Sequence, residues 1–80
     1  MNKVMEDTKV IVTINRATDK INKYLEKSGI APMKRLARID RKEEYLMQLK
    51  EKIDQIEDES KKIAVKIYKS ISKTNTAPSE

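Results

Sequence analysis

Apolar side chains recur every three or four residues along the second half of this 80-residue chain. They occupy alternating a and d positions of a heptad repeat, and only Ser60 interrupts them. This spacing places them on one face of a single long helix, and we call them the heptad row. The heptad row consists of Leu46, Leu49, Ile53, Ile56, Ile63 and Ile67. Such a row predicts a helical protein in which another helix covers this face.

A second apolar stripe in the first half of the chain predicts a helix from about residue 5 to residue 28. Its members are Val10, Ile14, Ala17, Ile21, Tyr24 and Leu25. Gly29 follows, and glycine supplies the left-handed residue that ends many helices. Pro32 suits the first position of a new helix, which needs no amide donor. We therefore expect a turn at residues 29–32 between two helices.

The second helix is expected from about residue 33 to residue 73, which makes it roughly 60 Å long. Asp40 and Glu43 have the spacing of a capping box, so a break near Ile39 or Asp40 stays an open alternative. The polar composition of residues 75–80 predicts a disordered tail. The predicted fold is all-α: one domain over residues 1–74, built as a two-helix hairpin with a long, amphipathic, coiled-coil-like second helix.

The first helix of such a hairpin covers only the near half of the second. Packing within the hairpin is assigned to Ile14, Ala17, Ile21, Tyr24, Leu25, Leu36 and Ile39. The distal part of the heptad row then lies uncovered, as an apolar patch that monomers rarely expose. We therefore predict self-association or binding of a partner protein through the heptad row. The function that follows is that of a helical adaptor, inhibitor or regulatory subunit.

Residues 9–14 admit a second interpretation, because Lys-Val-Ile-Val-Thr-Ile is rich in strand-forming residues. A strand here, followed by helices at about 17–28 and 33–48, resembles the ribbon-helix-helix family of DNA-binding proteins. The resemblance covers two-thirds of the chain and rests on the order of the elements. It implies that Lys9, Ile11 and Thr13 face the major groove, where Ile11 has no hydrogen bond to offer.

Basic residues gather in two blocks, and the net charge of the chain is +5. The first block consists of Lys34, Arg35, Arg38, Arg41 and Lys42. The second, which we call the lysine stripe, consists of Lys62, Lys66, Lys69 and Lys73. Three interpretations fit the stripe: the solvated face of a coiled coil, a surface for nucleic-acid phosphates, or a membrane-surface helix. The last is disfavoured because the opposite face offers Ile, Ala, Val and Tyr68 but no Trp or Phe. A small basic nucleic-acid-binding factor of the plasmid or virus type is the alternative function.

The composition argues against catalysis. The chain has no histidine and no cysteine, so it lacks the usual base near neutral pH and a thiolate nucleophile. A single glycine excludes a glycine-rich phosphate loop, and the acids of residues 51–59 lack the spacing of a calcium loop. We therefore expect no enzyme, no cofactor and no metal site. The sequence has no apolar run long enough for a membrane span and no secretory signal, which predicts a cytoplasmic protein.

Overall fold

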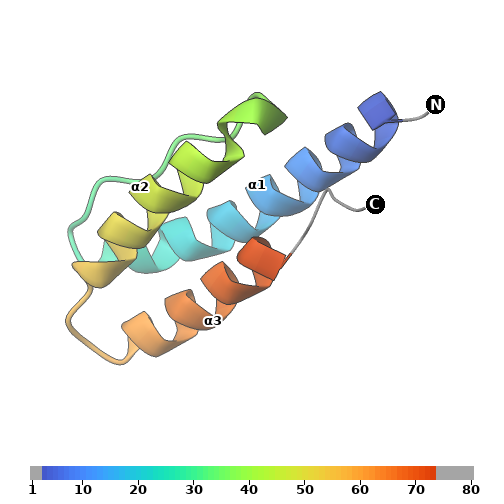
Figure 1. Ribbon diagram of the computed structural model, residues 1–80. Helices are drawn as coiled ribbons and strands as arrows, with labels where there is room; N and C mark the ends of the chain where they lie inside the picture. Colours follow the sequence, from blue (N-terminus) through green and yellow to red (C-terminus); the bar gives the residue numbers. More distant parts are fainter. Residues whose placement is uncertain (1–2, 74–80) are drawn as a thin grey trace.

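The described part of the chain forms three α-helices, which are joined by one long extended segment and one tight connection (Figure 1). Helix α1 spans Lys3–Lys27, α2 spans Lys42–Asp54 after a 3-10 turn (η1) at Ile39–Arg41, and α3 spans Ser60–Lys73. The computed structural model describes residues 3–73, so the tail predicted at residues 75–80 lies outside the described residues. The described part of the chain contains helices and no strand, which confirms the predicted all-α class.

Gly29 ends α1 through its left-handed conformation. Its φ is 75°, a value that residues with a side chain rarely adopt. The N–H of Ile30 donates to the carbonyl oxygen of Leu25 over 2.8 Å, and the N–H of Gly29 donates to that of Glu26 over 3.1 Å. These are the two hydrogen bonds of a Schellman motif, which satisfies carbonyl groups at the end of the helix.

Residues 30–38, which we call the strap, run extended along α1 instead of forming the first turns of a second helix. Every third side chain of this region turns inward, which is the period of an extended left-handed polyproline helix rather than of an α-helix. Pro32 therefore lies inside an extended segment, where its fixed φ is equally suitable. The inward side chains are Ile30, Met33, Leu36 and Ile39.

Two asparagines of α1 hold the strap in place. The Asn22 side chain donates from Nδ2 to the Met33 carbonyl (3.0 Å) and accepts at Oδ1 from the Met33 N–H (2.8 Å). Asn15 makes the same pair of bonds with Leu36, over 3.0 and 2.7 Å. The distance between the two asparagines along α1 matches the distance between Met33 and Leu36 along the strap. Seven residues of helix rise about 10 Å, and three residues of extended chain span about 9 Å. Each amide side chain thus takes the place of a backbone peptide from a neighbouring strand.

The strap decides the direction of the next helix. Asn15 bonds to Leu36 and Asn22 to Met33, so the strap runs antiparallel to α1 and returns the chain along it. As a result α2 runs parallel to α1, and α3 runs antiparallel to both (Figure 1). The two-helix hairpin is therefore not formed, and the continuous helix expected over residues 33–73 is wrong. An extended strap can place parallel helices side by side, which a tight turn cannot do.

The chain breaks near Asp40 without the predicted capping box. The Asp40 carboxylate pairs with Arg38 over 3.0 Å, and no side-chain hydrogen bond caps α2. A second break, at residues 55–59, separates α2 from α3. There the Asp58 carboxylate accepts a hydrogen bond from the N–H of Ser60 over 2.8 Å and so caps the start of α3. Ser60, which interrupts the heptad row, is the first residue of the new helix.

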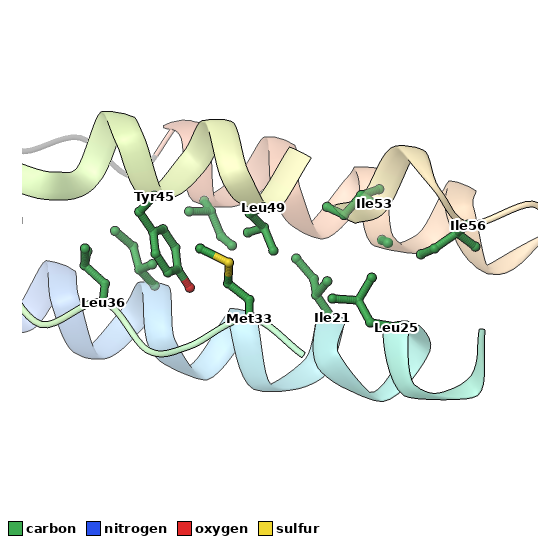
Figure 2. Packing of buried hydrophobic residues seen from close by; sticks show 11 residues of the cluster. Ile21, Leu25, Met33, Leu36, Tyr45, Leu49, Ile53 and Ile56 are labelled. Carbon is green, nitrogen blue, oxygen red and sulfur yellow. The ribbon is translucent and has the colours of Figure 1, made fainter. Parts of the chain in front are cut away.

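The break at residues 55–59 turns most of the heptad row into the core of its own chain. Leu49, Ile53 and Ile56 are at most 1% exposed. They lie with Tyr45 opposite α1 and the strap, as Figure 2 shows. Leu46 and Ile67 pack half-buried against this core, and Ile63 is 44% exposed. The prediction that the distal row lies uncovered is therefore wrong for its members other than Ile63, because α3 folds back on α1 and α2.

Of the residues expected to pack within the hairpin, all but Ile39 lie in the core or pack against it. Ile14, Ile21, Leu25 and Leu36 are buried, and Ala17, Tyr24 and Ile39 are half-buried. From α3, Ala64 and Ile71 complete the core. The strand considered for residues 9–14 is wrong, since these residues belong to α1. Lys9 and Thr13 are exposed there, and Ile11 packs against the core, so they do not share one outward face.

One polar pair lies inside the apolar core. The Thr18 hydroxyl is fully buried and donates to the Ile14 carbonyl over 2.9 Å. Its oxygen is then free to accept a hydrogen bond from the hydroxyl of Tyr45. Burial raises the pKa of the Tyr45 phenol, because the phenolate loses solvation, although the bond to Thr18 acts in the opposite direction.

We predict that the buried Tyr45 phenol makes the protein lose stability at alkaline pH, and that the substitution Tyr45→Phe removes this loss. Because the pKa of the Tyr45 phenol is higher in the folded state, the phenol contributes to the free energy of unfolding. This contribution is complete below the pKa of about 10 in the unfolded state, and it is lost as the pH rises through the pKa of the folded state. We expect the free energy of unfolding of the unmodified protein to fall more steeply between pH 9 and pH 11 than that of Tyr45→Phe. Urea denaturation across this range measures both. Equal slopes in the two proteins would contradict the buried phenol.

Candidate nucleic-acid interface

Helix α3 has two chemically different faces. Ala64 and Ile71 are buried, and Ile67 and Tyr68 pack half-buried against the core. The four members of the lysine stripe are all exposed. At 100° per residue, the stripe lies on the side of the helix opposite to Ala64 and Ile71. The stripe therefore points away from the rest of the protein.

The whole net charge of the chain resides in α3. This helix contains five lysines and no acid. The other thirteen basic residues of the chain are balanced by its thirteen acids. In the described residues, no carboxylate lies within 4.0 Å of a lysine of the stripe. The stripe is therefore an uncompensated positive surface.

The first basic block differs, because each of its arginines is paired with an acid. Arg35 contacts Asp19 over 2.9 Å, Arg38 contacts Asp40 over 3.0 Å, and Arg41 contacts Glu44 over 2.7 Å. The sequence shows only Asp40 within the block, and the fold adds Asp19 from α1. The two lysines of this block are Lys34, which is exposed, and Lys42, which is half-buried. The positive charge of the block is thus largely compensated.

An open hollow of about 420 Å³ lies between the strap and α2. Met33, Leu36 and Tyr45 contribute its apolar lining, and the arginines at positions 35, 38 and 41 line it as well. Their acidic partners leave it little net charge. The residues that line the hollow come from the strap, η1 and α2, whereas the lysine stripe belongs to α3. The two basic blocks therefore lie on different elements.

Several residues that organise this arrangement carry no motif in the sequence. Asn15, Asp19 and Asn22 fall at helical spacing on one side of α1, where they bind the strap. The period of three in the strap was the available signal, since apolar residues stand at positions 30, 33, 36 and 39. In the sequence, Thr18 is a polar residue that interrupts an apolar stripe. Only the fold brings it to Tyr45, with which it forms a buried hydrogen bond.

Comparisons of the chain with known protein families, with curated proteins and with solved structures find no match. Within the described residues, no group of three acidic, histidine or cysteine side chains is arranged to hold a metal ion. None of the helices in the described part of the chain has both the length and the hydropathy that a membrane-spanning segment needs.

Proposed function

We propose that this protein is a small non-enzymatic module that binds the phosphate backbone of nucleic acid through the lysine stripe of α3. The observation that carries the proposal is that four of the five lysines of the acid-free helix α3 share one exposed face, while acids and bases balance in the rest of the chain. Nucleic acid is a common polyanion that binds to such a surface, because the lysines neutralise phosphates and thereby release condensed counterions.

The dimensions of the stripe suit a phosphate backbone. From Lys62 to Lys73 it spans eleven residues, or about 16 Å of helix. One strand of a duplex carries a phosphate every 3.4 Å along its axis, so the stripe lies beside about five of them. A lysine ammonium is a point charge without the forked geometry that reads guanine. Binding is therefore expected to be independent of base sequence.

The adaptor function predicted from the heptad row has less support. Three of its six residues (Leu49, Ile53 and Ile56) lie in the core and are not available to a partner in this fold. The large apolar side chains that are exposed, among the described residues, are Val12, Met47 and Ile63, each on a different helix. Isolated side chains of this kind are normal on a protein surface.

Titration of a fluorescein-labelled DNA duplex, followed by anisotropy, tests the proposal. At about 50 mM salt we expect a dissociation constant in the micromolar range, since backbone contacts dominate nonspecific binding. With four lysines engaged, the logarithm of the association constant is expected to fall with that of the salt concentration with a slope of about −3.6. Absence of binding at this salt concentration would contradict the proposal.

A matched pair of variants separates the stripe from the overall charge. Replacement of all four stripe lysines with glutamine is expected to weaken binding at least tenfold, because about four phosphate contacts are lost. The control replaces Lys9, Lys20, Lys23 and Lys50, which are exposed on α1 and α2, with glutamine. It removes the same charge and is expected to change the affinity by less than about threefold. Equal losses would show that net charge, not the stripe, governs binding.

A further inference from the structure

The connection at residues 55–59 is compatible with two conformations. Its sequence, Gln-Ile-Glu-Asp-Glu, contains no glycine and no proline. In the described part of the chain, Gly29 is the only residue with a positive φ. The connection therefore contains no backbone conformation that only glycine adopts readily. The break between α2 and α3 is thus held by tertiary contacts and by one cap, not by the local backbone.

Side-chain spacing favours a continuous helix across this connection. The heptad row continues from Ile53 and Ile56 to Ile63 and Ile67 in one register. Glu57 stands four residues before Lys61, and Asp58 four residues before Lys62. Acid-to-lysine pairs at this spacing stabilise a helix. They require the chain to be helical through residues 57–62.

The observed structure uses these groups differently. The Asp58 carboxylate caps the Ser60 N–H over 2.8 Å, and the Lys61 ammonium approaches the Asp54 carbonyl at 3.4 Å. The two conformations therefore compete for the same side chains. The folded-back form prevails within one chain because it buries Ala64 and Ile71 against the core.

A second copy of the chain offers the same buried surface to α3. We propose that two copies exchange α3: in each copy α2 and α3 join through residues 55–59 into one helix, and each α3 packs on α1 of the other copy. The contacts of Ala64 and Ile71 are retained, because they are made to an identical surface. The two long helices then lie antiparallel, with the acids of residues 57–59 from both copies close together. Salt that screens their repulsion favours this dimer.

Two positions of the connection allow the equilibrium to be moved in opposite directions. Asp58→Ala removes the cap and inserts the best helix former, so it favours the exchanged dimer, whereas Asp58→Asn retains a capping side chain as its control. Glu59→Pro favours the folded-back form, because proline suits the first turn of α3 and breaks a continuous helix. The described structure gives the Glu59 N–H no acceptor, so the proline costs no hydrogen bond there. Glu59→Ala removes the same charge without the ring and serves as its control.

Sedimentation equilibrium at 0.5 M salt, with each protein at up to about 1 mM, measures the outcome. We expect the dimer fraction to rise from Glu59→Pro, which stays monomeric, through the unmodified protein to Asp58→Ala. The dimer fractions of the controls Asp58→Asn and Glu59→Ala are expected to lie closer to that of the unmodified protein than those of Asp58→Ala and Glu59→Pro do. A monomeric Asp58→Ala protein at the highest concentration, or dimers of Glu59→Pro equal to those of Glu59→Ala, would overturn the proposal.

A distance within one chain distinguishes exchange from simple association of folded monomers. Spin labels at Glu43→Cys and Lys69→Cys report on it, since the chain has no other cysteine. In a labelled chain diluted into unlabelled protein, a continuous helix sets the two positions about 39 Å apart. The folded-back form places α2 and α3 antiparallel in contact and gives a much shorter distance. A dimer that keeps the short distance would refute the exchange.

Discussion

Replacing Ile53 with aspartate is expected to unfold the protein. Ile53 is 1% exposed and lies in the core formed by the three helices and the strap (Figure 2). Loss of a buried isoleucine costs about 2–5 kcal/mol, and an unpaired buried carboxylate adds a desolvation penalty. Because small domains are stable by only about 5–15 kcal/mol, we expect no cooperative transition in urea denaturation followed by circular dichroism at 222 nm.

Ile63→Asp is the matched control for this prediction. Ile63 belongs to the same heptad row and is the same residue type, but its side chain is 44% exposed on α3. The substitution is expected to cost less than about 1 kcal/mol, as exposed substitutions usually do. If the heptad row faced a partner protein, both variants would be folded monomers. A folded Ile53→Asp monomer would therefore contradict the core described above.

The second large effect is expected from removal of the two asparagines that hold the strap. Asn15→Ala and Asn22→Ala together remove four hydrogen bonds to the backbone of Leu36 and Met33. Buried backbone groups left without partners cost about 1–3 kcal/mol each. We expect the double variant to lose about 3–5 kcal/mol, short of full additivity because released groups regain water. Amide hydrogen exchange at Met33 and Leu36 is expected to lose its protection first.

Asp19→Ala provides the comparison on the same face of α1. Asp19 stands between the two asparagines and contacts Arg35 of the strap, but through an exposed ion pair. Such a pair contributes about 0–1 kcal/mol, so this variant is expected to remain nearly as stable as the unmodified protein. If the asparagine variant were no less stable than Asp19→Ala, the bidentate bonds would not be what holds the strap.

Local signals account for the elements that were predicted well. The apolar stripe of α1 repeats with helical spacing, and Gly29 supplies the conformation that its end requires. These features depend on residues close together in the chain, where periodicity and backbone sterics act without help from the rest of the fold. The apolar character of Leu49, Ile53 and Ile56 was equally plain, but not the surface that covers them.

The strap was missed because two periods nearly coincide over a short segment. Apolar residues at positions 30, 33, 36 and 39 fit a period of three as well as one face of a helix. What separates the two is the pair of amides on α1, which offer extended backbone the bonds that a helix would make internally. Asn15 and Asn22 lie far from the strap in sequence, so no local pattern reveals the pairing.

The lysine stripe depends on α3 alone, and its chemistry was visible before the fold. Its exposure was settled only by the side of α3 that packs on the core. The charge of the first basic block could not be judged from the local sequence. Arg35 has no acidic neighbour there, and the fold supplies Asp19 from α1 as its partner.

Helix-forming residues and their apolar spacing determined that this chain is helical, where its first helix ends and which stretches carry an apolar face. The tertiary structure decided where the heptad row is interrupted and in which direction each helix runs. The physical reason is that burial has no preference between partners in the same chain and partners outside it. The strap and the capped turn at Asp58 bring α1 within reach of the row, and the chain then covers its own apolar surface.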